Sequence, residues 1–381
     1  MAARLGVDLP GFGENGAVIV GSNGKGSTAA MCAALLEQGG GPVGLFTSPH
    51  LLRLNERFRV DGEDISDDEL DLHWERVAAA IESAELDGEV GGFEFLFLIA
   101  ADWFAARGCA HTVWEAGIGG RLDPVRLIEA RRVALAALDF EHTDLLGSTL
   151  EAIACDKADA APEGATLFMS AVEAQVARAL HAHCAARGVH VETVAPALLA
   201  PLPGVHQRAN AALALALARD IAPLSQAQIG AGYAALRWPG RLEVIETDPD
   251  IVIDVGHTPR GIEAALEGFE QMRAGRRAVL VCGVSADKEA AAILARLAPA
   301  FESIVCAASA HKGARARDIA ALAAGANPDA EIVIAESAAD ARRIARAKAP
   351  AGIVYVAGSL FLAAEFKALA EGLDPANLSF F

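Results

Sequence analysis

A glycine-rich segment near the start of the sequence combines the residue types that hold phosphate groups. Residues 18–28 read Val-Ile-Val-Gly-Ser-Asn-Gly-Lys-Gly-Ser-Thr, so an apolar, β-branched run leads directly into the turn. Its glycines allow backbone N–H groups to face an anion, Lys25 can reach terminal phosphates, and the hydroxyl of Ser27 or Thr28 can contact Mg²⁺. A strand before the turn and a helix after it are the context that a phosphate loop requires.

The spacing in this segment departs from the general phosphate-loop pattern GxxxxGK[ST]. Only Ser22 and Asn23 separate the first two glycines, and Gly26 precedes Ser27. A glycine-rich turn that binds no ligand is therefore the alternative interpretation, and the motif alone does not exclude it.

The rest of the chain alternates short apolar runs with longer, alanine-rich stretches, in two series. The candidate strands are residues 17–20, 43–46, 111–115 and 133–138 in the first series, and 251–253, 278–281, 303–306, 331–334 and 353–356 in the second. This alternation predicts parallel sheets covered by helices. We therefore predict an α/β protein with an N-terminal P-loop domain, whose sheet is mostly parallel, and a C-terminal Rossmann-like α/β domain. A Trp-Pro-Gly turn at residues 238–240 separates the series, so we place the domains at residues 1–238 and 239–381.

The composition indicates a protein that acts on small molecules. With 381 residues, of which 53% are hydrophobic, the chain is long enough for two cores. A net charge of -18 repels nucleic-acid backbones and anionic lipid surfaces, so we expect neither as a partner. No apolar run reaches membrane-spanning length, and the six cysteines include no CxxC pair, so we expect a cytoplasmic protein with reduced thiols. We also expect a monomer.

Further short motifs follow the glycine-rich segment in a fixed order along the chain. They occupy residues 44–51, 55–58, 65–70, 93–94, 115–123, 142–147, 156–158, 204–207, 238–243, 254–259, 287–288 and 358–360. Together with the compact Gly-Ser-Asn-Gly-Lys-Gly-Ser loop, they resemble the motifs of the folylpolyglutamate and dihydrofolate synthases of the Mur ligase superfamily. The matches are collinear over nearly the whole chain, which is far more specific than any single motif.

The resemblance implies a reaction as well as a fold. Members of the family are ADP-forming ligases that use ATP and Mg²⁺ to convert a carboxylate into an acyl phosphate, which the amine of an amino acid then attacks. It implies that this chain has a P-loop ATPase domain and joins glutamate to dihydropteroate or to a folate. Such a site must offset the repulsion between a carboxylate and a triphosphate with cations and backbone donors.

The resemblance also implies a role for individual residues. The groups expected to bind the nucleotide are Gly21, Asn23, Gly24, Lys25, Gly26, Ser27, Thr28, Gln207, Asn210, Arg241 and Asp254. Those expected to hold Mg²⁺ are Ser27, Glu115, His142 and, as a carbamate, Lys157. Those expected to act in catalysis are Lys25, His142, Lys157, Arg241 and His257. Those expected to contact the acceptor or glutamate are Thr47, Ser48, Pro49, His50, His257 and Ser359.

Each of these residues also has an ordinary structural interpretation. Glu115 can be a carboxylate at the end of a strand, and His142 can be a loop histidine bound to backbone. Asp254 and Ser359 can cap helices. Lys157 can be a helix-surface lysine, and the Ala-Asp pair after it replaces the Ala-Gly that is usual in the family.

Three other functions remain open from the sequence. The first is a Mur-type ligase for a non-folate acceptor, because Pro-Val-Arg at residues 124–126 replaces the usual Ala-Thr-Asn. The second is a P-loop NTPase switch or kinase, although a simple switch needs no second α/β domain. The third is an inactive paralogue, which the intact Lys25, Ser27, Glu115 and His142 disfavour.

Overall fold

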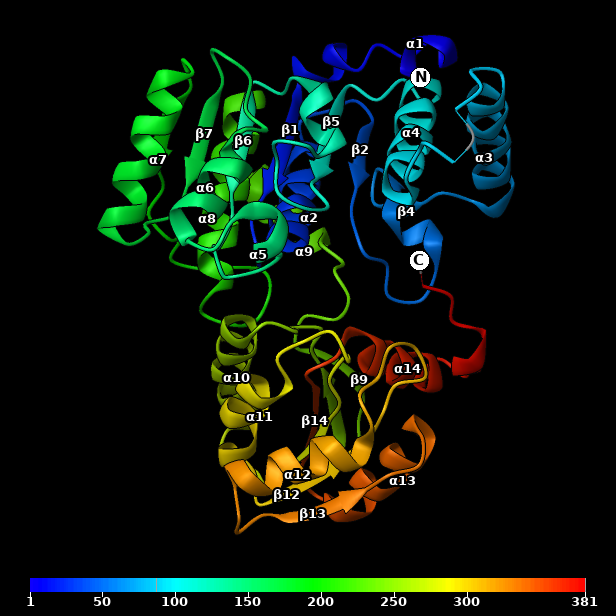
Figure 1. Cartoon of the computed structure of the whole chain (residues 1–381), viewed down its shortest axis with the longest axis vertical. Coiled ribbons are helices and arrows are strands. Elements are labelled where there is room, and N and C mark those ends of the chain that lie inside the picture. The colour runs from blue at the N-terminus through cyan, green and yellow to red at the C-terminus, as the bar shows by residue number, and fades with distance from the viewer. Residues whose placement is uncertain (87, 381) are drawn as a thin grey trace.

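The computed structural model describes residues 1–86 and 88–380 and has two lobes, each built around its own sheet (Figure 1). The lobes are stacked end to end, and the C-terminal segment runs back from the second lobe to the side of the first (Figure 1). Both sheets are largely parallel and covered by helices, which confirms the predicted α/β class. Among the described helices, none has the length and apolar composition needed to cross a bilayer.

The N-terminal lobe contains an eight-stranded sheet with the order β4-β3-β2-β5-β1-β6-β7-β8. Its strands are β1 (Gly16–Val20), β2 (Val43–Phe46), β3 (Phe58–Val60), β4 (Glu63–Asp64), β5 (His111–Glu115), β6 (Arg132–Leu135), β7 (Thr166–Met169) and β8 (His190–Thr193). The pairs from β2 through to β8 are parallel, whereas β3 and β4 add an antiparallel edge. The chain leaves β1 in one direction toward β2 and later returns to its other side as β6, so the sheet reverses its order at β1, where open α/β sheets bind ligands.

Helices cover both faces of this sheet. They are α1 (Ala2–Leu5), α2 (Lys25–Leu36), α3 (Asp67–Glu82), α4 (Gly92–Ala106), α5 (Thr143–Leu146), α6 (Leu150–Ala158), α7 (Ala174–Ala186), α8 (Gln207–Ile221) and α9 (Gln226–Ala235). The α2, α8 and α9 helices pack on one face, and α3, α4, α6 and α7 pack on the other. The central strands are therefore buried on both faces, which explains their continuous apolar sequences.

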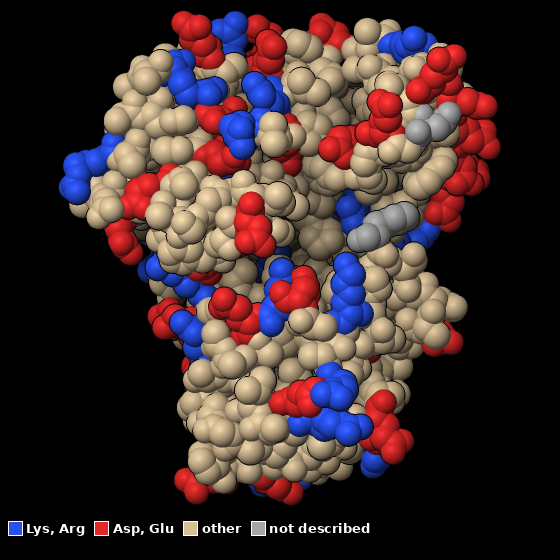
Figure 2. Space-filling model, in the orientation of Figure 1, with Lys and Arg blue, Asp and Glu red and all other residues tan. Residues whose placement is uncertain are grey.

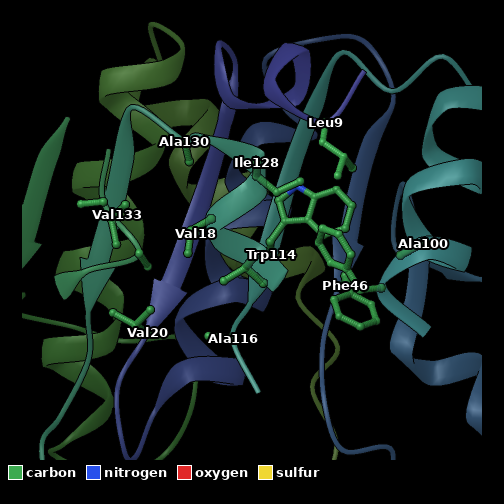
Figure 3. Close-up of a cluster of buried hydrophobic side chains, with 14 of the residues drawn as sticks. Leu9, Val18, Val20, Phe46, Ala100, Trp114, Ala116, Ile128, Ala130 and Val133 are labelled. Carbon is green, nitrogen blue, oxygen red and sulfur yellow. The ribbon is translucent and has the colours of Figure 1, made fainter. Parts of the chain in front are cut away.

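Alternate residues of β1 point into two different cores. Val18 and Val20 belong to a cluster that includes Trp114, whose ring is drawn between Leu9 and Phe46 (Figure 3). Ala17 and Ile19 belong to the cluster on the α2 side. This two-residue alternation fixes the register of the strand, because a shift of one position would exchange its two faces.

The C-terminal lobe contains a six-stranded sheet with the order β13-β12-β11-β14-β10-β9. Its strands are β9 (Glu243–Glu246), β10 (Asp250–Ile253), β11 (Ala278–Cys282), β12 (Ser303–Cys306), β13 (Glu331–Ile334) and β14 (Ile353–Ala357). Its helices are α10 (Pro259–Arg273), α11 (Ala290–Leu297), α12 (Ala316–Ala326), α13 (Ala338–Lys348) and α14 (Leu360–Ala370). Only the β9–β10 pair in this described sheet is antiparallel.

The structure adds strands and short turns that the sequence patterns do not predict. The additional strands are β3, β4, β7, β8 and β9. Short 3₁₀ turns occur at η1 (Pro10–Gly13), η2 (Leu54–Arg57), η3 (Pro124–Ile128), η4 (Ala298–Ala300) and η5 (Pro375–Asn377). The strand predicted at residues 133–138 ends at Leu135, because the chain then bends toward the phosphate loop, where Ala137 forms a bridge with Asn23.

Candidate functional site

A cavity of about 680 Å³ lies between the two lobes, where the carboxyl ends of β1, β5 and β6 face the start of α10. The face drawn in Figure 2 is hollowed between the lobes, and Lys and Arg atoms gather there. The predicted site residues that line the cavity are Asn23, Gly24, Lys25, Gly26, Ser27, Ser48, Pro49, Glu115, His142, Gln207, Asn210, Arg241, Asp254 and His257. Segments far apart in the sequence thus meet around one space that is large enough for a nucleotide.

Two glycines of the phosphate loop, residues 21–28, lie where a side chain would collide with a neighbour. Gly24, the N-cap of α2, also has a left-handed backbone with a φ of 81°, and a Cβ there would lie 2.5 Å from Oδ1 of Asn210. A Cβ at Gly26 would lie 2.9 Å from the ring of Trp238. The loop and the N-terminus of α2 therefore present backbone N–H groups to the cavity, which is the arrangement that binds phosphate.

Two lysines meet at the carbonyl oxygen of Gly21. The Nζ atoms of Lys25 and Lys157 each donate a hydrogen bond of 3.0 Å to that oxygen. Lys157 also pairs with Glu141 at 2.7 Å, and its side chain is only 1% exposed. Burial and the charge of Lys25 lower the pKa of Lys157, while Glu141 opposes the shift. A lowered pKa favours the neutral amine that carbamylation needs, so the carbamate stays a prediction that the environment of Lys157 supports.

Two of the residues predicted to hold Mg²⁺, Ser27 and Glu115, present oxygen ligands to the cavity. Ser27 is fully buried, and its hydroxyl has no hydrogen-bond partner among the described residues. Glu115 is buried, and its Oε2 accepts a 3.0 Å bond from the backbone N–H of Ser48. Burial raises the pKa of Glu115, although Lys25, Ser48 and Arg241 oppose the shift. An unpartnered hydroxyl beside a buried carboxylate fits a hard cation.

These side chains do not form a complete protein cage for a metal. Within residues 1–86 and 88–380, no group of three His, Cys, Asp or Glu side chains is placed to hold one. His142 lines the cavity in a left-handed backbone conformation, with a φ of 45°, and burial lowers the pKa of its ring. Mg²⁺ usually keeps several waters and bridges substrate phosphates, so an incomplete protein ligand set is the arrangement expected for it.

The first turn of α8 forms a polar wall beside the phosphate loop. Nδ2 of Asn210 donates a 2.9 Å bond to Oε1 of Gln207, and both side chains are buried. Nε2 of Gln207 lies 3.1 Å from Nε2 of His206, which also lines the cavity. The predicted pair at residues 207 and 210 therefore lies on one helix face, and the imidazole of His206, which was given no role from the sequence, extends it.

The C-terminal lobe contributes the opposite wall. Asp254 follows β10, and its two oxygens accept backbone N–H bonds from Leu242 at 3.2 Å and Gly256 at 2.8 Å. Burial raises the pKa of this carboxyl, and the nearby Arg241 lowers it. Arg241 lines the cavity from the junction between the sheets. Asp254 thus shapes the turn that carries His257, while it faces the cavity as well.

His257 is held as a neutral imidazole. Its Nδ1 lies 3.1 Å from the carbonyl oxygen of Val255, so this nitrogen carries the proton and donates it. Burial lowers the pKa of His257 to about 4, and the positive charges of Lys288, Arg241 and Lys25 add to the shift. The other ring nitrogen is then a hydrogen-bond acceptor at the edge of the cavity.

The 47–52 loop borders a smaller pocket of about 50 Å³ beside the main cavity. Thr47, Ser48, Pro49 and His50 all line it, together with Arg241. The carboxylate of Glu56 accepts hydrogen bonds of 2.7–2.9 Å from the N–H groups of Leu51 and Leu52, at the end of this loop, and of Arg53, which follows it. A single side chain thereby fixes the turn.

Groups from the second lobe hold the tip of the same loop. Leu51 is 6% exposed and belongs to the hydrophobic cluster of the C-terminal lobe, with Ile251 and Val255. His50 receives a 2.9 Å bond from Nε of Arg57, and its Nε2 lies 2.7 Å from the carbonyl oxygen of Ser379. The 47–52 loop is therefore a bridge between the lobes.

The remaining predicted residues lie near the cavity without lining it. Gly21 and Thr28 belong to the phosphate loop itself, where Thr28 is fully buried, and Lys157 donates a hydrogen bond to the carbonyl oxygen of Gly21. Ser359 caps α14, where its Oγ accepts a 3.4 Å bond from Leu362. Ser359 lines neither of the two cavities. Its capping role accounts for its position, and contact with glutamate stays a prediction.

Four other residues of this region were given no site role from the sequence. They are Glu141, His206, Thr258 and Arg260. His206 and Thr258 stand within the motifs at residues 204–207 and 254–259, whereas Glu141 and Arg260 each stand next to a motif. Glu141 and Arg260 are also charged, but the sequence does not show that they face the same space.

Comparisons with known proteins identify the same family as the sequence motifs. A family model described as "Mur ligase, glutamate ligase domain" matches residues 240–360. A probable bifunctional folylpolyglutamate synthase/dihydropteroate synthase of Halobacterium salinarum is 34% identical over 377 residues, which is 91% of this chain and 46% of that protein. This chain therefore spans less than half the length of that relative. The folylpolyglutamate synthase of Lacticaseibacillus casei is 33% identical over 75% of this chain and 74% of that protein.

A solved structure resembles both lobes together. It is the Mycobacterium tuberculosis folylpolyglutamate synthase complexed with ADP and AMPPCP, with a TM-score of 0.86 and 27% sequence identity. The match covers 97% of this chain and 95% of that one, so the similarity includes the relative placement of the lobes as well as each sheet.

Proposed function

Because the chain belongs to the folylpolyglutamate synthase family, we propose that it is an ATP-dependent, ADP-forming ligase that joins glutamate to a carboxylate acceptor, dihydropteroate or a folate. The observation that carries this proposal is the pair of facing walls of the cavity. One wall has the phosphate loop with Lys25, Ser27 and Glu115, and the other has Arg241 and His257. A ligase needs this arrangement, because a triphosphate and an amine must approach one carboxylate from different sides.

The phosphate loop and the cations of Lys25 and Arg241 bind the triphosphate in this proposal. Backbone N–H groups of residues 23–26 and Lys25 hold the terminal phosphates, and Arg241 reaches them from the other lobe. Gln207 and Asn210 contact the adenine. Ser27, Glu115 and His142 hold Mg²⁺, which supplies Lewis-acid stabilisation of the phosphate oxygens when it is bound. As an ammonium, Lys157 holds the carbonyl oxygen of Gly21 by a hydrogen bond. As a carbamate, it adds a further anionic ligand for Mg²⁺.

Glutamate and the acceptor occupy the remaining space. The residues of the 47–52 loop border the acceptor, whose carboxylate then lies next to the phosphate loop. His257 presents an unprotonated nitrogen, because its other nitrogen donates to Val255. That nitrogen can accept a hydrogen bond from the amine of glutamate and so orient it toward the acyl phosphate. Ser359 lies in the same lobe as a more distant candidate for glutamate.

We further propose domain limits of 1–238 and 239–381 and a cytoplasmic, monomeric protein. The first sheet ends at Thr193, α9 ends at Ala235, and the second sheet begins at Glu243, which supports a junction between the last two. All six cysteines are free thiols, which supports a reducing compartment. Light scattering of the purified chain measures its oligomeric state.

The test is turnover with a panel of acceptors. The purified chain is incubated with MgATP, glutamate and each of dihydropteroate, a reduced folate and a non-pterin carboxylate, and phosphate release and product mass are measured. Phosphate release that depends on acceptor and a product one glutamyl unit heavier support the proposal. If only the non-pterin carboxylate is glutamylated, the proposed pterin acceptor is wrong and the ligase assignment stands. Nucleotide hydrolysis without any amide product would overturn the ligase assignment.

A further inference from the structure

The hydroxyl of Thr258 joins the two lobes at the phosphate loop. Its Oγ1 donates a 3.1 Å hydrogen bond to Oδ1 of Asn23, a residue of the phosphate loop 235 positions away in sequence. The same oxygen accepts a 3.1 Å bond from the N–H of Gly261 and so caps α10. Thr258 is 8% exposed, which keeps water from competing strongly for either bond.

A hydroxyl is well suited to this position because it both donates and accepts. The one hydrogen of Thr258 goes to Asn23, and a lone pair receives the helix N–H. Serine retains both bonds, whereas alanine loses both. The contact therefore depends on the hydroxyl oxygen and not on the volume of the side chain.

The backbone of α10 lies close to the phosphate loop at the same point. A Cβ at Gly261 would lie 3.2 Å from Oδ1 of Asn23 and 3.0 Å from Oγ1 of Thr258, so no larger residue fits without a shift. A second contact lies beside it, where Nη1 of Arg260 donates to the carbonyl oxygen of Leu138 at 3.5 Å. The first turn of α10 thus rests directly on the N-terminal lobe.

The two ends of this contact belong to opposite sides of the proposed reaction. Asn23 precedes Gly24 and Lys25, which hold the phosphates in the proposed function. Thr258 follows His257, which orients the amine. A displacement of about 1 Å between such groups can lower a rate by about two orders of magnitude.

We propose that Thr258 is a positioning residue, whose hydroxyl couples the phosphate loop to α10 and thereby aligns His257 with the nucleotide. The proposal rests on the proposed ligase function for its rate effect. The coupling itself can be measured with a nucleotide alone, so it does not depend on which acceptor is used.

The first experiment separates positioning from helix capping. Thr258→Ala is compared with Thr258→Ser and with Ser337→Ala, which removes the cap of α13, where Ser337 accepts a 3.2 Å bond from Asp340 away from the cavity. Both alanine variants lose a cap, so we expect a similar loss of stability in each. We expect kcat to fall about tenfold in Thr258→Ala only, with the KM for ATP changed less than about twofold and with recovery in Thr258→Ser.

The second experiment reads the coupling without turnover. Hydrogen exchange of peptides from α10 is followed by mass spectrometry with and without MgADP. We expect MgADP to slow exchange in α10 in the wild type, Thr258→Ser and Ser337→Ala, and to leave it unchanged in Thr258→Ala. Protection of α10 by MgADP in Thr258→Ala, or a kcat equal to that of Ser337→Ala, would overturn the proposal. If no acceptor is turned over at all, the ligase assignment fails while the exchange data still decide the coupling.

Discussion

The phosphate loop and the 47–52 loop border the same cavity, yet one takes its shape mainly from its own lobe and the other from both lobes. The backbone of the phosphate loop is confined by neighbours such as Asn210 and Trp238, which leave no space for a Cβ. The 47–52 loop is held by Glu56 on one side, and by the C-terminal core and Ser379 on the other. The phosphate loop therefore takes most of its shape within one lobe, whereas the 47–52 loop, on the proposed acceptor side, depends on how the lobes meet.

This difference has a consequence for specificity. A loop shaped mainly within one lobe should keep its geometry if the other lobe is displaced, so we expect nucleotide binding to tolerate a change in how the lobes meet. A site shared between lobes forms fully only when they are together, which restricts the acceptor side to the closed arrangement. The substitutions below test the contrast, from the largest expected effect to the smallest.

Removal of the phosphate-loop cation should have the largest effect. We expect Lys25→Ala to lower kcat/KM by about 10³-fold, because a positive charge that stabilises the transferring phosphate is lost. The fold should persist, since the hydrogen bond from Lys25 to Gly21 is only partly buried and Lys157 donates to the same oxygen. Steady-state kinetics and circular dichroism measure the two quantities, and turnover equal to the wild type would contradict the phosphate role.

Distortion of the phosphate-loop backbone should come next. At a φ of 81° an alanine is strained by about 1–2 kcal/mol, and its Cβ would overlap Asn210 at 2.5 Å. We therefore expect Gly24→Ala to weaken MgADP binding by about 10²-fold in titration calorimetry. Gly230→Ala is the matched control, because this exposed glycine of α9 has nothing within 4 Å of the new Cβ. Equal affinity in the two variants would show that the loop is less confined than its contacts indicate.

Weakening of the shared loop should affect the acceptor more than the nucleotide. Leu51→Ala removes a side chain that is 6% exposed and packs in the C-terminal core, which should lower stability by about 2–4 kcal/mol. We expect the KM for the acceptor to rise about tenfold while MgADP affinity changes little. The control is Leu198→Ala, at a position that is 86% exposed. A parallel loss of nucleotide affinity would remove the contrast between the two loops.

The smallest expected effect concerns acid stability. The pKa of His257 is about 4 in the folded protein because of burial, and about 6.5 when the chain is unfolded. Between these values the unfolded chain binds the additional proton, so stability contributed by neutral His257 is lost as the pH falls through this window. We expect His257→Gln to lose less stability than the wild type between about pH 7 and about pH 5 in denaturant titrations. An identical loss in both proteins would mean that His257 is accessible to protons when folded.

The central fold was predictable because its strands are buried on both faces. β1 and β2 are continuous apolar runs with adjacent turns, and such runs are recognisable without any knowledge of partners. Two of the strands that were missed have mixed sequences. β8 reads His-Val-Glu-Thr and β9 reads Glu-Val-Ile-Glu, and both lie at a sheet edge where polar residues face solvent. Their pairing depends on neighbours from distant segments, so a local pattern cannot predict it.

The candidate site was predictable where a motif carries its own chemistry. The glycine and lysine pattern of the phosphate loop indicates an anion site by itself. Contacts between segments were not predictable: the bonds from Thr258 to Asn23 and from Lys157 to Glu141 join residues whose proximity exists only in the fold. For Ser359 the motif predicts contact with a substrate, whereas the structure shows its hydroxyl capping α14.

Trp238 lies where its intrinsic fluorescence can report on the mouth of the cavity. Its ring lies against Gly26 of the phosphate loop, borders the pocket beside the 47–52 loop, and has the guanidinium of Arg59 at 5.3 Å from its centre. Trp114, by contrast, is sealed in the core (Figure 3) and contributes a constant background. Intrinsic fluorescence should therefore respond to events at the mouth of the cavity, without any attached dye.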